Sequence, residues 1–288
     1  MEEKKKKYAY FLLDGCLKLK KGDKLFIIAN DLIEDFVDIV INEAKKMGLD
    51  NIKTLINHPF LEKELYLNKS YEEIITSPLI DKRIYNKMAK EGYAFLNLSS
   101  PLPEFFKDVD SELLAKVSSY ELSMIDEYRD YQNKGLIKWN ISAVPNEIWA
   151  NSLPKVRNVT ELWRLILDIC LINEDSPKLA WQEKMNTLMK KAEYLNDLHI
   201  DKLVYTNNLG TKLEIGLPEN YVFASAQITN LVNLPSEEIF TSPDKGFLSC
   251  PEHIPPKIPY LPACSWFPPA FWHLPWKFPL RTVLRPPG

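Results

Sequence analysis

The feature that most constrains the fold is an apolar run, an amphipathic segment and a second apolar run in close succession. Residues 24–29 (KLFIIA) are largely apolar and short enough for a strand buried on both faces. Residues 31–47 repeat apolar side chains every three or four positions, as one face of a helix does. Residues 51–56 (NIKTLI) have the composition of a second strand. This order predicts a right-handed βαβ unit with parallel strands.

Residues at both ends of the amphipathic segment favour a helix there. Asn30 or Asp31 can cap its start, because either side chain can accept a hydrogen bond from a free backbone N–H group. Gly48 can adopt the left-handed conformation that commonly ends a helix. We therefore expect the helix to end immediately before the second strand.

The alternation of helices and strands continues, so we predict an open, mostly parallel α/β domain over residues 1–150. No GxGxxG or P-loop motif occurs, so the sequence does not support a nucleotide site. The further elements expected in this domain are helices around 70–91 and 118–133 and strands at 94–98 and 137–144.

A second region, residues 151–246, is predicted to hold a helical connection and the start of a β-rich α+β domain that is incomplete. Its apolar period changes from 3.6 to 2 after His199, which indicates a change from helix to strand. The expected elements are helices at 159–173 and from Pro177 to about 196, a hairpin of strands 202–206 and 211–215, and a strand at 221–228.

The last segment, residues 247–288, has a different composition. It holds 11 of the 21 prolines and three of the seven tryptophans, and Glu252 is its one acidic residue. Proline at this density cannot sustain a helix or sheet. We expect that this tail is not native to the fold and that a frame shift or a misjoined gene end produced it. The alternative is a proline-rich recognition tail that binds a protein partner.

Charge and cysteine usage limit the partners and the compartment. Lys plus Arg is 36 and Asp plus Glu is 39, a balance that argues against a nucleic-acid partner. No apolar run is long enough for a membrane span or a signal sequence. We expect a cytoplasmic protein with free cysteines, because no CxxC pair occurs. The cysteines are Cys16, Cys170, Cys250 and Cys264, of which the first two are expected to be buried.

Five segments follow one another in an order that matches a known family. Residues 8–23 are similar to its opening helix and turn, and residues 145–150 (PNEIWA) to its Pro-x-x-x-Trp-Ala segment. The stretch 162–181 and the hairpin 209–217 (LGTKLEIGL) continue the match. The most specific segment is 233–244 (NLPSEEIFTSPD), close to Asn-x-Pro-Thr-Glu-Glu-Val-Phe-Thr-x-Pro. On these segments the chain resembles the thermophilic aminopeptidase family of metallopeptidases (the aminopeptidase T and aminopeptidase S group).

The chain departs from the family pattern near the hairpin. Lys212 replaces the common Asp of Gly-Thr-Asp-Leu, and the segment between Tyr221 and Asn233 is shorter than usual. Both departures are expected to change the shape of the substrate cleft.

The resemblance implies a hydrolase that releases N-terminal amino acids from peptides with two divalent metal ions. Zinc, cobalt and magnesium are not distinguished by the sequence. The family's ligands are two Glu, two His and an Asp, with a Tyr nearby, and the first Glu lies in the Pro-Thr-Glu-Glu motif. By that match Glu237 or Glu238 is a metal ligand. Only one of the two should face the metals, because successive strand residues face opposite sides, and Glu237 is slightly favoured. Homodimers are common in the family.

The structural alternative for these glutamates is an exposed helix start with Ser236 as the N-cap. The other expected ligands, a His and then a His-x-Asp, should follow residue 246. The histidines there, His253 and His273, are not followed by Asp two positions later. We expect His58 to be a turn residue and His199 to be structural at a helix end.

Because one carboxylate cannot hold a metal pair, we predict no measurable aminopeptidase turnover from the isolated chain. A non-catalytic α/β fragment or binding protein is therefore the alternative function.

Overall fold

The computed structural model describes residues 1–206, 210, 212–218 and 221–223. The chain divides into two compact units, Met1–Lys178 and Leu179–Gly288, and each is described by itself. The domain boundaries expected at residues 150 and 246 remain predictions.

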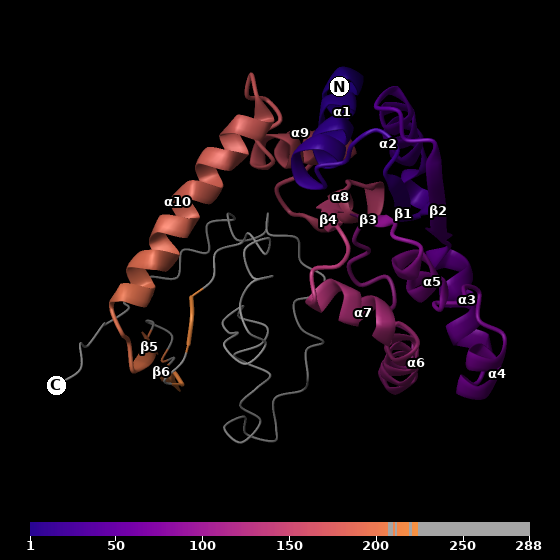
Figure 1. Ribbon diagram of the computed structural model, residues 1–288. Coiled ribbons are helices and arrows are strands. Elements are labelled where there is room, and N and C mark those ends of the chain that lie inside the picture. The colour runs from indigo at the N-terminus through magenta and orange to yellow at the C-terminus, as the bar shows by residue number, and fades with distance from the viewer. Residues whose placement is uncertain (207–209, 211, 219–220, 224–288) are drawn as a thin grey trace. The chain divides into compact units, whose positions relative to one another are not determined.

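The first unit is built on a four-stranded parallel sheet (Figure 1). The strands are β1 (Lys24–Asn30), β2 (Asn51–Asn57), β3 (Ala94–Ser99) and β4 (Trp139–Ala143), in the order β2-β1-β3-β4. Leu25 pairs with Ile52 on one side and with Ala94 on the other. The predicted open parallel α/β fold is thereby confirmed.

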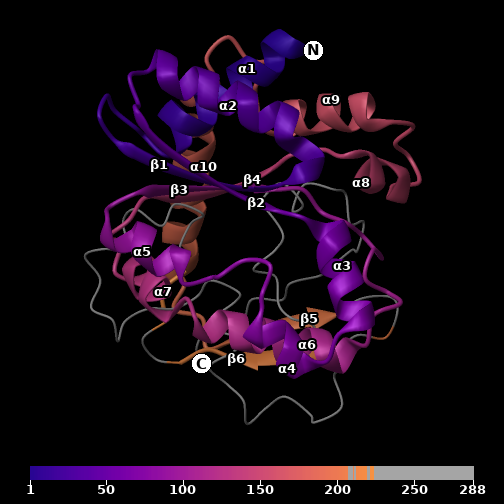
Figure 2. The same ribbon diagram turned by 90° about the vertical axis from the view of Figure 1, so that its right-hand side faces the viewer.

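Helices cover both faces of this sheet (Figure 2). On one face lie α1 (Glu2–Tyr10), α2 (Glu34–Lys46) and α9 (Val159–Ile169), and on the other lie α5 (Ile84–Lys90) and α7 (Asp126–Asn133). The remaining helical elements of this unit are η1 (Phe11–Cys16, a π-helix), η2 (Asp31–Ile33, a 3-10 helix), α3 (Pro59–Asn68), α4 (Tyr71–Thr76), α6 (Ser111–Ser123) and α8 (Glu147–Ser152).

The βαβ unit forms as the sequence predicts. Asn30 caps the helical segment, since its side chain accepts a hydrogen bond from the Leu32 N–H at 3.2 Å. Gly48 has φ +79°, the left-handed conformation expected after the helix. A 3-10 turn precedes α2, so the α-helix itself begins at Glu34.

The helices between the strands differ from the prediction. The segment α3 was not expected, and the region 70–91 is two helices, α4 and α5, separated by a stretch that contains Pro78. The region 118–133 is also two helices, α6 and α7. The first begins at Ser111, because the Asp110 side chain caps it through the Glu112 N–H.

The face under α1, α2 and α9 is packed by rings from three helices. Tyr8 stacks on Phe36 with ring centroids 5.7 Å apart, and Trp163 lies 5.1 Å from Phe36. All three side chains are buried. Helices that are far apart in sequence are joined here by one aromatic cluster.

The opposite face holds a second core under α5 and α7. Phe26 of β1 and Phe95 of β3 meet edge to face at 5.4 Å, and Met88 of α5 is buried against them. Half-buried rings, among them Tyr85 and Tyr128, surround this core. Successive side chains of β1 point to opposite faces of the sheet, so this one apolar strand contributes to the core on each face.

The helix α10 (Pro177–Asp197) begins at the end of the first unit and continues into the second, where it leads to an antiparallel hairpin of β5 (Lys202–Thr206) and β6 (Lys212–Gly216). The hairpin prediction is confirmed. Residues 221–223 are not in a strand, so the predicted strand does not begin at Tyr221, and 224–228 lie outside the described residues. Instead the Asn196 side chain holds the Phe223 backbone: its Nδ2 donates to the Phe223 carbonyl at 3.1 Å, and its Oδ1 accepts from the Phe223 N–H at 2.7 Å.

Across the described positions, no helix is both long enough and apolar enough to pass through a membrane.

Candidate functional site

The carboxyl edge of the sheet is the natural place to search for a site. In open α/β folds, ligands bind outside the carboxyl ends of the strands, where the strand order reverses. Here the reversal lies between β1 and β3. The polar residues at or just after the ends of the four strands include Asn30, His58, Ser100 and Asn146.

A hydrogen-bonded network fixes the ends of β3 and β4. Asn146 donates to Ser100 Oγ at 2.7 Å and to the Pro101 carbonyl at 2.9 Å. Its side-chain oxygen accepts from the Trp149 N–H at 2.8 Å and so caps α8. Ser100 Oγ in turn donates to the Val144 carbonyl at 2.8 Å. These bonds give the segment 145–150 a structural role, because they fasten the sheet edge to α8.

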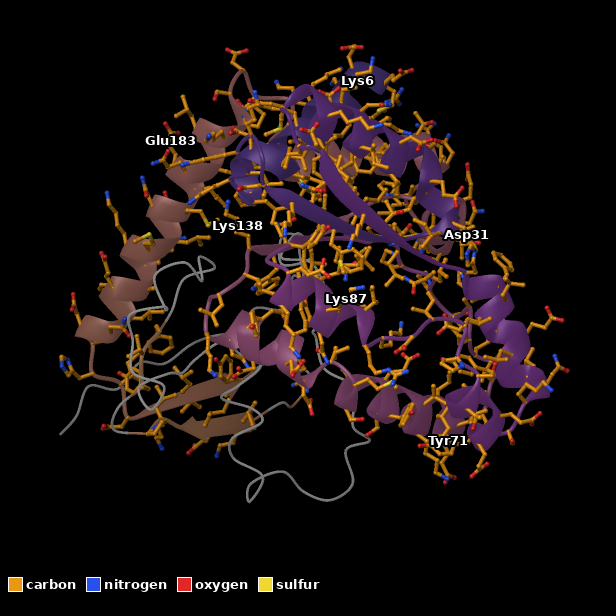
Figure 3. The ribbon with its side chains drawn as sticks, turned by 45° about the vertical axis from the view of Figure 1, so that its right-hand side comes forward. Lys6, Asp31, Tyr71, Lys87, Lys138 and Glu183 are labelled. Carbon is orange, nitrogen blue, oxygen red and sulfur yellow. The ribbon has the colours of Figure 1, made fainter. Side chains whose placement is uncertain are left out.

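Asp31, which is labelled in Figure 3, forms a second pair with His58 at this edge. His58 Nδ1 lies 3.0 Å from Asp31 Oδ2, so the two residues join the ends of β1 and β2. The other oxygen, Asp31 Oδ1, is buried and has no hydrogen-bond partner among the described residues. His58 precedes Pro59, the first residue of α3, so it also occupies the turn that the sequence predicts.

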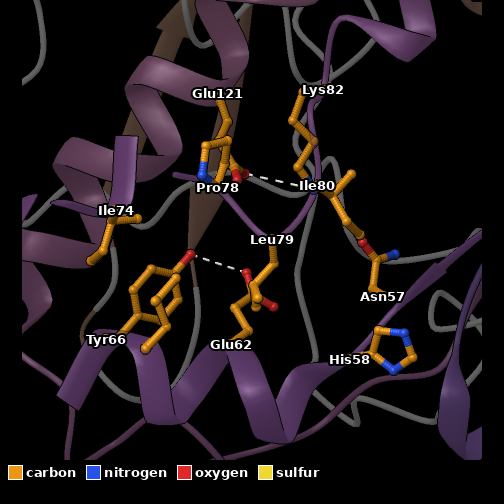
Figure 4. Close-up of a pocket in the computed structure, with 11 residues that line it drawn as sticks. Asn57, His58, Glu62, Tyr66, Ile74, Pro78, Leu79, Ile80, Lys82 and Glu121 are labelled. Atoms are coloured by element: carbon orange, nitrogen blue, oxygen red, sulfur yellow. Dashed lines mark hydrogen bonds and ion pairs between the residues drawn. The ribbon is translucent and has the colours of Figure 1, made fainter. Parts of the chain in front are cut away.

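A small pocket of about 30 Å³ lies beside His58, with room for about one water molecule (Figure 4). One hydrogen bond and one ion pair join residues that line it. Tyr66 donates to Glu62 Oε1 at 3.0 Å, and Lys82 Nζ lies 3.7 Å from Glu121 Oε2. Burial raises the pKa of the Glu121 carboxyl, while Lys82 opposes the shift. The lining residues are Asn57, His58, Glu62, Leu65, Tyr66, Ile74, Pro78, Leu79, Ile80, Lys82 and Glu121.

Cys16 and Cys170 are thiols rather than a disulfide, and they lie near the buried Tyr8. Tyr8 donates to the Ala143 carbonyl at 3.1 Å, and Cys170 Sγ is 3.9 Å from its hydroxyl. Burial raises the pKa of Cys16 to about 12 and that of Cys170 to about 11. Since the thiolate is the reactive form, this cluster is unsuited to nucleophilic catalysis near neutral pH.

The predicted metal ligands Glu237 and Glu238 lie outside the described residues, as do His253 and His273. Within the described part of the chain, no group of three or more His, Cys, Asp or Glu side chains is arranged to hold a metal ion. The assignment of Glu237 or Glu238 as a metal ligand therefore remains a prediction.

The sequence reasoning overlooked that His199 and Asp201 have the His-x-Asp spacing of the expected ligands. They precede the Pro-Ser-Glu-Glu segment, however, whereas the expected motif follows it. His199 Nδ1 lies 2.9 Å from the Asp197 carbonyl, and His199 has φ 47°. This is the structural role predicted at the end of α10.

Comparison of the sequence with known families finds a match over most of the chain. The model of the family described as thermophilic metalloprotease (M29) matches residues 1–248. This range contains all five segments that carry the resemblance and ends close to the point where the composition changes.

Curated proteins similar to this chain are aminopeptidases. Aminopeptidase AmpS of Bacillus subtilis (strain 168) is 27% identical over 248 residues, which are 83% of this chain and 60% of that protein. Aminopeptidase 2 of Geobacillus stearothermophilus is 26% identical over a stretch that makes up 85% of this chain and 61% of that protein. The chain thus spans about three-fifths of the length of these relatives.

A solved structure shares the fold. Wild-type AmpT from Thermus thermophilus aligns with a TM-score of 0.65 at 22% identity, over 75% of this chain and 54% of that chain. At this identity the likeness concerns the fold alone.

Proposed function

Because the chain belongs to the thermophilic metalloprotease (M29) family, we propose that its function is the metal-dependent release of N-terminal amino acids from peptides. The observation that carries the proposal is the family match over residues 1–248, which includes the segment 233–244. The aminopeptidase names of the similar curated proteins support the same reaction. The proposed substrates are peptides with a free N-terminus, and the proposed location is the cytoplasm.

Within this proposal Glu237 or Glu238 supplies one carboxylate to the metal centre. Divalent ions prefer carboxylate oxygen and imidazole nitrogen, so the donor type fits the role. When bound, such ions lower the pKa of a water ligand and polarise the scissile carbonyl. The chain's own contribution is a carboxylate whose removal should weaken metal binding at that position.

The test is to measure bound metal and turnover of the full chain after loading with zinc, cobalt or magnesium. We expect Glu237→Gln or Glu238→Gln, but not both, to lower the metal content. Glu183→Gln on the exposed side of α10 is the matched control and should leave the metal content unchanged. Equal metal content in all four proteins would contradict the ligand assignment.

Turnover distinguishes the enzyme from a non-catalytic member of the family. Saturable, metal-dependent release of the first residue of a tripeptide would support the enzyme and overturn our expectation of an inactive isolated chain. Metal binding without turnover, or neither, would favour the non-catalytic alternative. That alternative rests on a sequence observation, since His253 and His273 lack the spacing expected of the later ligands. A dimer, common in the family, would appear as a doubled mass in solution.

A further inference from the structure

The strand β2 has an outer edge without a strand partner. It lies at one end of the order β2-β1-β3-β4, so one of its edges pairs with β1 and the other faces away from the sheet (Figure 1). Among the described residues no strand pairs with that outer edge. Every second residue of β2 therefore directs its backbone N–H and C=O groups outward, where another strand could bind them.

β2 lacks the features with which proteins usually protect such an edge. Edge strands are commonly short, bulged, interrupted by proline or guarded by a charged side chain. β2 instead pairs with β1 without a bulge over its whole length and contains no proline. Its one charged residue, Lys53, is drawn inward. Lys53 Nζ lies 3.3 Å from Glu91 Oε2 and 4.9 Å from the ring centroid of Tyr93, which precedes β3. The lysine therefore reaches over β1 and does not guard the outer edge.

The sequence of β2 reads almost the same in both directions. In NIKTLIN the residues at equal distances from the central Thr54 are identical in two of the three pairs. The identical pairs are Asn51 with Asn57 and Ile52 with Ile56, and the third pair is Lys53 with Leu55. A strand of this kind suits a two-fold axis, because each residue then meets the position that meets it in turn.

We propose that β2 is a dimer interface, at which two copies of this chain pair antiparallel about Thr54 and join their sheets into one. A second copy fits this edge better than an unrelated strand, because it presents the same near-symmetrical run. The pairing covers the outer edge of β2 in both copies, so this contact closes at two chains.

The side chains of β2 fit this register. Ile52, Thr54 and Ile56 share one face of the sheet, since alternate residues of a strand lie on the same side. In the dimer Thr54 meets its own counterpart and Ile52 meets Ile56, and such β-branched pairs stabilise antiparallel strands. On the other face Lys53 falls opposite Leu55, so like charges are not directly opposed. Both isoleucines are half-buried in the single chain, so pairing buries more of their apolar surface.

The first test is disulfide cross-linking of the full chain through Thr54→Cys, with oxidised glutathione as the oxidant. Counterparts on the axis have Cβ atoms about 5 Å apart, within reach of a disulfide. Asn51→Cys is the matched control. It is exposed on the same strand, but its two copies lie six residues apart along the pair, about 20 Å. We expect peptide mass spectrometry to find the 54–54 link at least about tenfold more often than the 51–51 link.

A second test removes the pairing by charge. Thr54→Glu places two carboxylates directly opposite each other and should weaken dimer formation at least about tenfold in analytical ultracentrifugation. Asn51→Glu adds the same charge at another exposed position of the strand, where it does not meet its counterpart. It should change the dimer affinity by less than about threefold. If Thr54→Glu fails to fold, the cross-linking result decides.

Several results would overturn the proposal. One is a chain that stays monomeric at about 100 µM. Another is a dimer without the 54–54 link, or one that Thr54→Glu leaves as tight as Asn51→Glu does. A monomeric chain that binds a strand of another protein at this edge would overturn it as well. These measurements do not involve bound metal or turnover, so the inference stands or falls separately from the proposed function.

Discussion

The two faces of the parallel sheet are packed in different ways. Under α1, α2 and α9 the rings of Tyr8, Phe36 and Trp163 are at most 4% exposed, and they come from helices up to 155 positions apart, from Tyr8 to Trp163. Under α5 and α7 the buried rings come from Phe26 and Phe95 of the strands and from Tyr93 just before β3, while Tyr85 and Tyr128 remain half-buried at the rim. The first face joins distant parts of the chain, and the second is assembled from the helices next to each strand.

The largest expected effect comes from emptying the first face. Phe36→Ala should destabilise the protein by about 3–5 kcal/mol, because a fully buried ring leaves a cavity among neighbours from three helices. Tyr128→Ala on the opposite face should cost about half as much, since its ring is partly exposed and can be replaced by water. Urea unfolding measures both. Equal losses would remove the distinction between the faces.

The thiols beside Tyr8 report on the same face. The pKa values of about 12 and about 11, against an ordinary 9.0, leave Cys16 with about 1,000-fold and Cys170 with about 100-fold less thiolate than an exposed cysteine. We expect alkylation of each thiol to be slower by at least about its own factor in the native protein than in urea. Peptide mass spectrometry at fixed pH gives the rates. If the alkylation rates in the native protein matched those in urea, the thiols on this face of the sheet would be accessible to solvent, which would contradict the prediction.

The Tyr8 hydroxyl provides a smaller test. Tyr8→Phe removes the hydrogen bond to the Ala143 carbonyl and leaves that acceptor buried, which should cost about 1–2 kcal/mol. Tyr131→Phe at the rim of the opposite face is the control and should change stability by less than about 0.5 kcal/mol. Thermal unfolding of the two variants side by side checks the difference, and the reverse ranking would contradict it.

The smallest effect is expected in α4, which belongs to neither face. The Glu73 carboxylate accepts from the Ser70 N–H and Oγ at 3.0 Å and from Lys69 at 2.9 Å. The hydrogen bond from the Ser70 N–H group, followed in size by the one from Lys69, lowers the pKa of the Glu73 carboxyl to about 2. The ionised Glu73 therefore stabilises the first turn of α4 at pH values above 4.5, its ordinary pKa. This stabilisation is lost as the pH falls towards 2. The Glu73 ¹³C titration should show a midpoint near 2, whereas one near 4.5 would refute the cap.

The sequence predicted the sheet well because its strands are apolar and bounded by caps and glycines. Asn30, Gly48 and the run 24–29 each indicated a local structure that tertiary packing did not change. The segment α3 was missed because its exposed Phe60, Leu61 and Leu67 do not form a stripe of period 3.6. The one local signal was Pro59 at the first helical position.

The candidate site was less accessible to sequence reasoning. The pairing of Asp31 with His58 depends on the register in which Asn30 lies beside Asn57, and no local pattern encodes it. The pocket carboxylates Glu62 and Glu121 are 59 positions apart and meet only after α3 and α6 have packed. The family signature around Glu237 was recognised as a motif, which requires no knowledge of how the chain folds.

The strand order has a consequence for the synthesis of the chain on the ribosome. The central strand β1 pairs with β3, and Leu25 lies beside Ala94. About 70 residues separate these partners, so at roughly 5–20 residues per second β1 waits about 4 to 14 s for β3 to be translated. During this interval only β2 can protect one of its edges. The nascent chain therefore carries an exposed apolar strand for seconds, and a chaperone that holds such segments would find its binding site in residues 24–29.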